Sequence, residues 1–266
     1  QQQPRSAAEP PRPAAERDAG DFFDWAAQRG AGGAGADGGR LLYLKDWHMA
    51  RACRAAGVRP PYSAPRYLTA PLHDWLNLHL EDDYRFCYVG VAGTWTPLHH
   101  DVLLSYSWSA SVCGRKRWVF FPPEATHLLL DRQREAAPSA EPGGRPAGWE
   151  ARFPGLPEAW ERRVEFVQEP GELVFVPSGW YHQVENLDDA VSINHNWLNG
   201  SNALQVWGFL QSELRAVRSA IGDVRETFDS AQEFEEQCEV LMRANCGLGR
   251  AGWLSLLAAA ASAALG

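Results

Sequence analysis

Alternation of apolar and polar residues predicts a β-rich central region. A period of two places successive side chains on opposite faces of a strand, and it is strongest in four segments. These segments are 105–112, 115–121, 172–176 and 190–196. Shorter apolar runs bounded by turn residues predict two more strands at 41–44 and 85–91. The centre of the chain is therefore expected to form β-sheets.

Helical spacing replaces this alternation after residue 200. Apolar residues recur every three or four positions between 201 and 243, as expected for amphipathic helices that pack on a domain. The stripe consists of Leu204, Trp207, Leu210, Leu214, Val217, Ile221 and Val224. Packing on the domain is the ordinary use of such a stripe, and formation of a homodimer through these C-terminal helices is the alternative. A short helix is also predicted at 22–28.

This order of elements predicts a mainly β fold with flanking helices, of the α+β class. A two-sheet jelly roll, the double-stranded β-helix of cupin-like proteins, accommodates it. Residues 1–40 are expected to form a disordered or incomplete N-terminal arm, 41–200 the β core and 201–266 the helical region. Within the core, residues 124–163 are rich in Pro, Gly, Ala and Arg and are expected to be a low-complexity insertion.

Composition narrows the choice of partners and compartment. The net charge of −8 argues against direct nucleic-acid binding as the main activity and favours protein partners that bring basic residues. Five cysteines without paired or metal-type spacing suit a reducing compartment, so we expect the cytoplasm, with the nucleus as a second location. The alanine-rich tail at 254–265 is too short to span a bilayer, and no membrane association is expected.

Two histidines and one aspartate are candidate metal ligands. His99 and Asp101 are two residues apart, so on an extended chain both side chains point to one side while His100 points away. His182 follows a Pro-Ser-Gly turn and begins the next strand. Without the other candidates, it would be interpreted as a structural histidine at the start of a strand. Two imidazoles and one carboxylate that leave free coordination positions are the usual ligands of non-haem Fe(II) oxygenases. A His-x-acid pair is weak by itself, because His79-Leu80-Glu81 has a similar form.

Lysine usage draws attention to Lys116. The chain has 25 basic residues, but only Lys45 and Lys116 are lysines. In the alternating strand that follows Cys113-Gly114, Lys116 shares a face with Trp118 and Phe120. A lysine on an aromatic face needs an anion, and the alternative is a side chain that extends along a barrel wall to solvent.

Four motifs in this order and spacing resemble the Jumonji-C (JmjC) class of 2-oxoglutarate- and Fe(II)-dependent oxygenases. They are Thr96-Pro97-Leu98-His99-His100-Asp101, Gly114-Arg115-Lys116-Arg117-Trp118, Pro177-Ser178-Gly179-Trp180-Tyr181-His182 and Ile193-Asn194-His195-Asn196-Trp197. Within the class, the stretch 42–210 is most similar to a lysyl hydroxylase of the translation termination machinery. Such enzymes use Fe(II), with 2-oxoglutarate and O2 as co-substrates, and the resemblance implies the same cofactors here.

The resemblance implies roles for the two strongest groups of candidates. His99, Asp101 and His182 match the metal ligands of the family. Lys116 matches the base that pairs with the far carboxylate of 2-oxoglutarate. No further catalytic residue beyond the metal ligands is implied.

Four more residues are candidates for the co-substrate pocket. Thr96 and Asn194 fall where the family places hydroxyl or amide groups that hydrogen-bond the far carboxylate. Ser109 falls where many relatives have asparagine, and Tyr88 would add a phenol at a looser spacing. Taken singly, Thr96 would be a strand-end turn residue and Asn194 a solvent-facing strand residue, but their joint placement favours the pocket.

Three functions follow as hypotheses. The first is a protein hydroxylase that acts on a lysine side-chain carbon of a translation termination (release) factor and converts 2-oxoglutarate to succinate and CO2. The second applies the same cofactors to N-methyl-lysine and gives demethylation. The third is a non-catalytic JmjC-like binding module. The identity of the protein substrate rests wholly on the resemblance.

Overall fold

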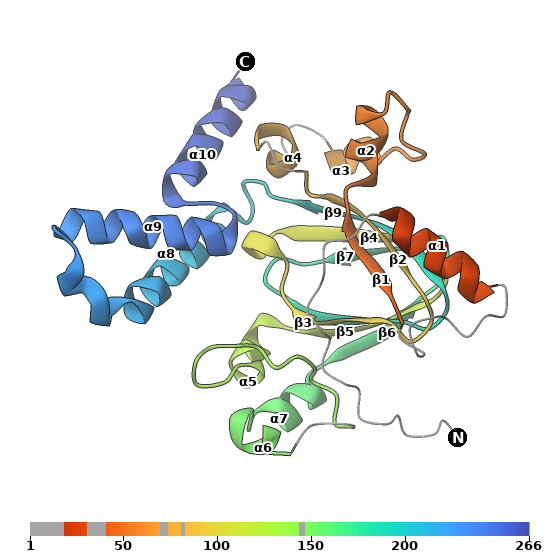
Figure 1. Ribbon diagram of the computed structural model, residues 1–266, viewed down its shortest axis with the longest axis horizontal. Coiled ribbons are helices and arrows are strands. Elements are labelled where there is room, and N and C mark those ends of the chain that lie inside the picture. Colours follow the sequence, from red (N-terminus) through yellow and green to blue (C-terminus); the bar gives the residue numbers. More distant parts are fainter. Residues whose placement is uncertain (1–18, 31–40, 70–73, 81–82, 144–146, 266) are drawn as a thin grey trace. The chain divides into compact units, whose positions relative to one another are not determined.

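A computed structural model describes most of the 266-residue chain (Figure 1). The described ranges are 19–30, 41–69, 74–80, 83–143 and 147–265. Residues 1–18 and 31–40 of the predicted N-terminal arm at 1–40 lie outside the described residues. Of the predicted arm, helix α1 (Ala19–Gly30) is described, and it confirms the helix expected at 22–28. The α1 helix packs on strand β1, where the rings of Phe23 and Trp47 meet edge to face at 5.8 Å.

Nine strands within the described residues form two antiparallel sheets. They are β1 (Tyr43–Trp47), β2 (Arg85–Gly90), β3 (Trp95–His99), β4 (Tyr106–Cys113), β5 (Lys116–Phe121), β6 (Val164–Gln168), β7 (Leu173–Val176), β8 (Tyr181–Asn186) and β9 (Ala190–Trp197). One sheet has the order β1-β2-β9-β4-β7 and the other β3-β8-β5-β6. Neighbours in each sheet come from distant parts of the sequence, as in a jelly roll. The predicted fold class is confirmed.

A core of alternate residues joins the two sheets. On β5, Trp118 and Phe120 turn inward and pack against Val174 and Val176 of β7. Lys116 lies on the same inward face and is only 2% exposed, as the alternation predicted. Arg117 takes the opposite face, where it pairs with Glu141 and Glu165. The period of two therefore assigned the β5 side chains to the correct faces.

The segment at 124–163 builds a second core on the outer face of the β3-β8-β5-β6 sheet. Its elements are η2 (Pro123–Ala125), α5 (Thr126–Leu129), α6 (Trp149–Arg152) and α7 (Leu156–Glu161). Their apolar side chains bury Leu98, Val119 and Phe121, which point outward from the sheet. Composition indicated a low-complexity insertion, but the described part of this segment is well packed because its few large apolar residues are placed at the sheet.

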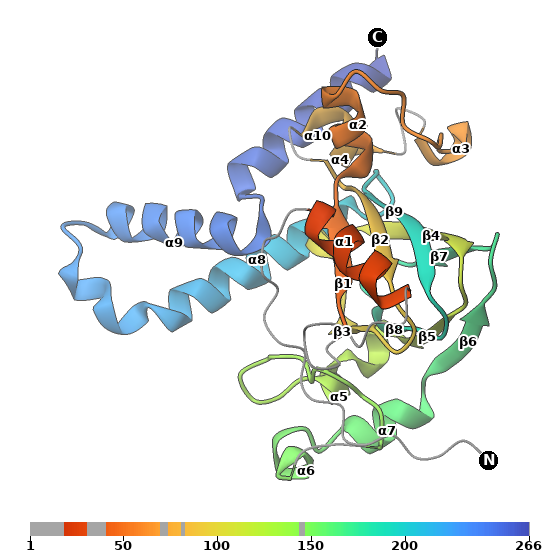
Figure 2. The same ribbon diagram turned by 45° about the vertical axis from the view of Figure 1, so that its right-hand side comes forward.

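A second compact unit contains helices. Its elements are α2 (Met49–Ala55), α3 (Arg66–Thr69), α4 (Trp75–His79), the turn η1 (Val102–Leu104), α8 (Ala203–Ala220), η3 (Gly222–Thr227), α9 (Ala231–Cys246) and α10 (Arg250–Leu265). Figure 2 shows α8 and α9 side by side. Ser230 caps the start of α9 by accepting from the Glu233 amide, and Gly247 ends it in the left-handed region at φ +77°.

The predicted helical stripe is correct in its centre and wrong at its ends. Leu210, Leu214 and Val217 are buried, whereas Leu204 is 83% exposed and Val224 is 41% exposed. Leu204 lies in the first turn of α8, and Val224 lies in η3, where the spacing of an α-helix no longer applies. Among the described residues, no single helix is long and apolar enough to cross a membrane. The α9 and α10 helices meet those criteria only together, across a bend of 65°.

Candidate metal centre

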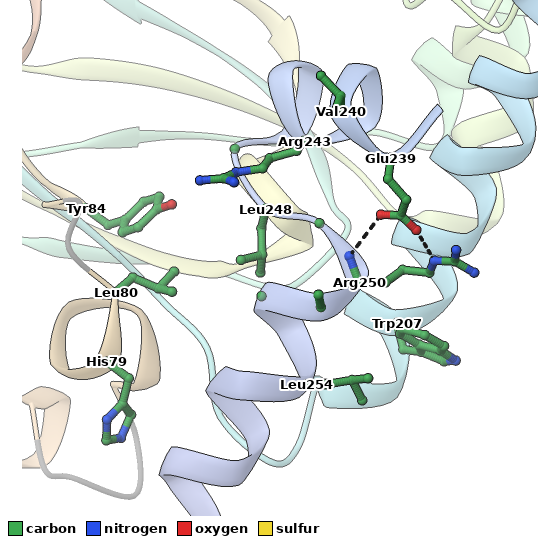
Figure 3. Close-up of a pocket in the computed structure, with 14 residues that line it drawn as sticks. His79, Leu80, Tyr84, Trp207, Glu239, Val240, Arg243, Leu248, Arg250 and Leu254 are labelled. Atoms are coloured by element: carbon green, nitrogen blue, oxygen red, sulfur yellow. Dashed lines mark hydrogen bonds and ion pairs between the residues drawn. The ribbon is translucent and has the colours of Figure 1, made fainter. Parts of the chain in front are cut away.

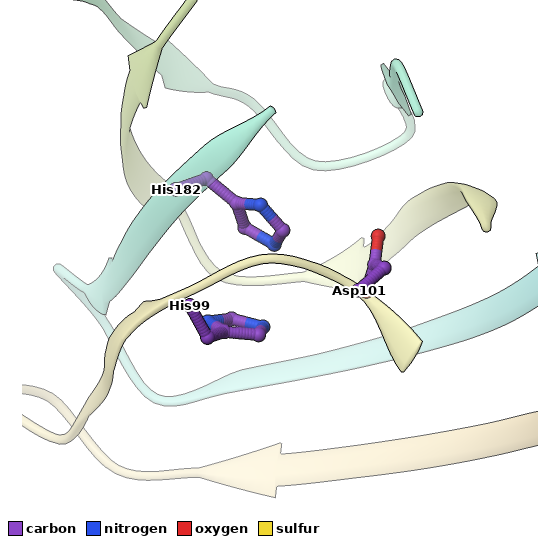
Figure 4. A group of neighbouring side chains, drawn as sticks. All are labelled: His99, Asp101 and His182. Carbon is purple, nitrogen blue, oxygen red and sulfur yellow. The ribbon is translucent and has the colours of Figure 1, made fainter. Parts of the chain in front are cut away.

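The structure brings the three candidate metal ligands together. The ligand atoms of His99, Asp101 and His182 all lie within 4.8 Å of one another, and the side chains point toward a common space (Figure 4). His99 ends β3 and faces His182 of β8 as its antiparallel partner, with ring centroids 4.3 Å apart. Asp101 follows two residues after His99. His100 turns away, as predicted, and its ring lies edge-on to Tyr181 at 5.1 Å.

Both histidines are held in the tautomer that a metal requires. The Nδ1 atom of His99 is 2.8 Å from the carbonyl oxygen of Pro97, and Nδ1 of His182 is 3.2 Å from that of Trp180. A carbonyl oxygen can only accept, so each Nδ1 carries a proton, and in the neutral imidazole Nε2 is then the nitrogen that can bind a metal. Orientation of a metal-binding imidazole through its second nitrogen is the usual arrangement in metal sites. The donor set therefore fits a divalent metal ion.

Aromatic rings form one wall of this centre. The imidazole of His182 stacks on Phe120 at 5.4 Å and lies 5.8 Å from Trp118. Phe120 also stacks on Phe166 of β6 at 5.7 Å. The Trp118 indole donates to Gln168 at 2.9 Å, so its one polar group is satisfied. This packing leaves His182, which is only 3% exposed, little freedom to rotate.

Lys116 is a buried cation on β5, the strand that also carries Trp118 and Phe120. Desolvation lowers the pKa of its ammonium group to about 8, and the groups that act on it electrostatically are Cys87, Cys113 and Lys45. In the described part of the chain, no carboxylate forms an ion pair with it. Burial of a charged lysine without a counter-ion is unfavourable. Binding of an anion is therefore strongly favoured, because the anion replaces the interactions that the ammonium group lost with water.

Tyr43 hydrogen-bonds Asn186, the strand partner of Lys116, and was not predicted from the sequence. Burial raises the pKa of its phenol to about 12, and side-chain hydrogen bonding from Thr96 and Asn186 partly offsets that rise. Asn186 is the antiparallel partner of Lys116 on β8. Gly90 permits this close packing, since a Cβ there would lie 2.2 Å from the Asn186 amide nitrogen. A cation, a phenol, a hydroxyl and an amide in one place suit a carboxylate ligand.

Comparison with known proteins agrees with this geometry. The family described as JmjC domain, hydroxylase matches residues 86–197, which include all three metal-ligand candidates and Lys116. Residues 86–197 of the chain therefore match a JmjC domain. It is 43% identical over 221 residues to the zebrafish (Danio rerio) protein named 2-oxoglutarate and iron-dependent oxygenase JMJD4, covering 81% of this chain and 49% of that one.

Other relatives carry two kinds of name. The human protein, also named 2-oxoglutarate and iron-dependent oxygenase JMJD4, is 43% identical over 211 residues, covering 78% of this chain and 48% of its own length. An Arabidopsis thaliana relative named arginine-specific demethylase JMJ20 is 42% identical over 232 residues, covering 78% of this chain and 46% of its own. The chain spans about half the length of these relatives. The predicted cofactors, Fe(II) and 2-oxoglutarate, agree with the JMJD4 names.

The residues of this JmjC domain fit both cofactors. His99, Asp101 and His182 would hold Fe(II), and Lys116 with Thr96 and Tyr43 would hold the far carboxylate of 2-oxoglutarate. When bound, iron and 2-oxoglutarate supply the oxidation with O2. The contribution of the chain is to fix two imidazoles in the required tautomer, to present one buried positive charge and to exclude water with aromatic rings.

Ser109 and Asn194 come together on neighbouring strands of the JmjC domain. The Ser109 hydroxyl donates to the Asn194 side-chain oxygen at 3.3 Å, and Ser192 donates to the same oxygen at 3.0 Å. These two hydroxyls fix the Asn194 amide so that its nitrogen points the other way. The predicted co-substrate roles of Ser109 and Asn194 stay predictions.

The predicted co-substrate role of Tyr88 also stays a prediction. Its hydroxyl donates to the exposed Asp46 carboxylate at 2.8 Å, although its ring lies 6.2 Å from that of Tyr43. Tyr43 is a phenol that hydrogen-bonds Thr96, and it was not among the predicted pocket residues. Pairing of β1 with β2 places Tyr43 opposite Gly90, and the sequence signal for that pairing was only a short apolar run.

Proposed function

We propose that this chain catalyses Fe(II)- and 2-oxoglutarate-dependent hydroxylation of a protein side chain. The observation that carries the proposal is the combination of two histidines and one carboxylate, grouped as metal ligands, with a desolvated lysine on β5, the strand that pairs with the His182 strand β8. One oxygen atom of O2 would enter a substrate C–H bond and the other would enter succinate, with loss of CO2 from 2-oxoglutarate. The names of the JMJD4 relatives support this reaction class.

A lysine side chain of a translation termination (release) factor is the proposed substrate. The net charge of −8 favours a basic protein partner, and the aromatic wall beside His182 suits the apolar stem of a lysine. Such a partner is met in the cytoplasm, which is the proposed compartment, with the nucleus as the second. Neither direct nucleic-acid binding nor membrane association is part of the proposal.

Mass spectrometry of a lysine-containing substrate tests the reaction. Incubation of the purified chain with Fe(II), 2-oxoglutarate and a release-factor fragment should add one oxygen atom to a lysine, and omission of 2-oxoglutarate should abolish the product. The 2-oxoglutarate analogue in which an NH group replaces the methylene next to the keto carbon keeps both chelating oxygens and serves as an inhibitor control. Absence of product together with absence of Fe(II) binding would favour the non-catalytic binding module instead.

Demethylation is the second candidate function. It is favoured by one specific observation, the demethylase name of the Arabidopsis thaliana relative at 42% identity. Because both reactions consume 2-oxoglutarate, succinate formation cannot separate them. Loss of a methyl group from N-methyl-lysine or N-methyl-arginine peptides, without oxygen gain on the unmethylated peptide, would decide for demethylation.

Homodimerisation through the C-terminal helices is a further proposal. Val240 of α9 and Leu254 of α10 are each 58% exposed, and both line an open cavity of about 920 Å³ in the helical unit (Figure 3). Burial of such apolar groups is a favourable contribution to association. Light scattering of the purified chain should give twice the monomer mass, and Val240→Asp should restore the monomer.

A further inference from the structure

Asp101 differs from the two histidines in how its backbone is held. Strand β3 ends at His99, so Asp101 lies beyond the hydrogen-bonded ladder. The chain then turns through Val102–Leu104, where Leu103 has φ +54° and Leu104 has φ +51°. Two successive leucines in the left-handed region carry a conformational cost that the surroundings must offset. A turn of this kind does not by itself fix the direction of the Asp101 carboxylate.

The turn is braced from both sides. The Leu104 amide donates to the Asp101 carbonyl at 3.1 Å, and the fully buried Asn202 side chain donates to the Leu104 carbonyl at 3.4 Å. Asn196 of β9 donates to the Ser105 hydroxyl at 3.0 Å. These contacts secure the backbone between Asp101 and the start of β4, and so they fix the distance from the carboxylate to the β4 side chains.

Ser107 of β4 contacts the carboxylate itself. Its hydroxyl donates to Oδ2 of Asp101 at 2.7 Å, and the residue is only 5% exposed. A hydroxyl-to-carboxylate bond of this length in a buried place is charge-assisted and directional. The bond holds one carboxylate oxygen in place and so fixes the orientation in which the Asp101 carboxylate would meet a metal ion.

We infer that Ser107 is a positioning residue for the Asp101 ligand, a role that complements the two backbone carbonyls behind His99 and His182. The histidine contacts come from main-chain atoms and cannot be deleted by substitution. The Ser107 contact comes from a side chain, so it can be removed while all three ligands stay in place. The inference rests on the proposed metal centre and is independent of the identity of the protein substrate.

Two pairs of variants isolate the hydroxyl. Ser107→Thr and Ser107→Val add the same branch to a strand position, but only threonine keeps the donor. Ser107→Ala can be compared with Ser111→Ala, because Ser111 is also buried on β4 and donates instead to the Cys113 and Gly114 carbonyls. The alanine pair provides the same contrast if the valine variant does not fold.

Manganese binding measured by electron paramagnetic resonance tests the inference without turnover, since free Mn(II) gives a signal that weakens on binding. We expect Ser107→Val and Ser107→Ala to bind roughly 10- to 100-fold more weakly than the wild-type chain, as for other partners of metal ligands. Ser107→Thr and Ser111→Ala should bind like the wild type. Melting temperatures without metal should match within each pair.

Three outcomes would overturn the inference. Equal Mn(II) affinity in the threonine and valine variants would show that the hydroxyl does not act on the ligand. Equal weakening by Ser111→Ala would indicate a general loss of packing in β4. Failure of the wild-type chain to bind either Mn(II) or Fe(II) would remove the metal centre, and with it the proposed function, whereas the first two outcomes leave that function intact.

Discussion

The metal-ligand group (His99, Asp101 and His182) and the Lys116 region (Lys116 and its strand partner Asn186) meet along β8 but are prepared in opposite ways. Phe120 pairs with His182, and Lys116 pairs with Asn186, along one β5–β8 ladder. At the ligand group, the imidazoles already have hydrogen-bond partners that fix their direction. At Lys116, the ammonium group is desolvated and has no carboxylate partner among the described residues. The metal-ligand side chains are already oriented for a metal ion, whereas the desolvated Lys116 ammonium group is unfavourable until an anion binds to it.

The largest effect is expected from substitutions that remove a residue of the metal-ligand group and leave the Lys116 region intact. His99→Ala or His182→Ala should abolish Fe(II) binding and lower 2-oxoglutarate turnover by more than about 100-fold, since even outer partners of ligands affect binding 10- to 100-fold. Isothermal titration under anaerobic conditions measures the metal, and succinate formation measures turnover. His100→Ala is the matched control and should behave like the wild type. Unchanged turnover in His99→Ala would show that the metal assignment is wrong.

The second largest effect is expected from a substitution of Lys116 that leaves the metal-ligand group intact. Lys116→Met should raise the KM for 2-oxoglutarate by roughly 30-fold or more, because loss of one partner of a buried charge pair costs about 2–5 kcal/mol. Fe(II) affinity without co-substrate should not change. Arg115→Met provides the control, since Arg115 is exposed and paired with Asp188. A parallel loss of Fe(II) binding in Lys116→Met would mean that the two regions are not separable.

The pH dependence of the free energy of unfolding tests the desolvation of Lys116 without any ligand. Because burial lowers the pKa of Lys116 to about 8, the unfolded chain, with an ordinary lysine pKa, binds more protons between pH 8 and about 10.4. Stability of the wild-type chain should therefore rise through this window by roughly 3 kcal/mol relative to Lys116→Met. Denaturant unfolding of both proteins at several pH values measures the difference. A constant difference would contradict a desolvated ammonium group.

The smallest effect concerns the phenol beside Thr96. Tyr43→Phe should raise the KM for 2-oxoglutarate about five-fold, since one hydrogen bond contributes about 1 kcal/mol. Tyr88→Phe should leave it unchanged, because the Tyr88 hydroxyl donates to the exposed Asp46. Steady-state kinetics at saturating Fe(II) distinguish the two. The reverse result would restore Tyr88 as the pocket phenol.

The local alternation of residues correctly predicted which side chains share a face of a single strand. Alternation placed Lys116 beside Trp118 and Phe120, and the two-residue spacing placed His99 and Asp101 together with His100 turned away. Tyr43 and Asn186 were missed because their neighbours depend on the pairing of β1 with β2 and of β5 with β8. Such long-range pairing has no signature in local residue patterns.

The same limit applies to supporting contacts. The Ser107 hydrogen bond spans six residues, but it requires a left-handed turn at two leucines, which residue preferences disfavour. The helices of 124–163 were missed because each is only four to six residues long, and their stability comes from the sheet beneath them rather than from their own sequence.

The packed segment at 124–163 also sets a lower size limit for engineered versions of this fold. Its apolar residues cover Leu98, Val119 and Phe121, each adjacent in the chain to a residue of the inner wall or ligand group. Removing the segment as a dispensable loop would expose the back of the very strands that carry His99 and Phe120. A minimal catalytic scaffold must therefore retain this outer layer or replace it with another apolar cover.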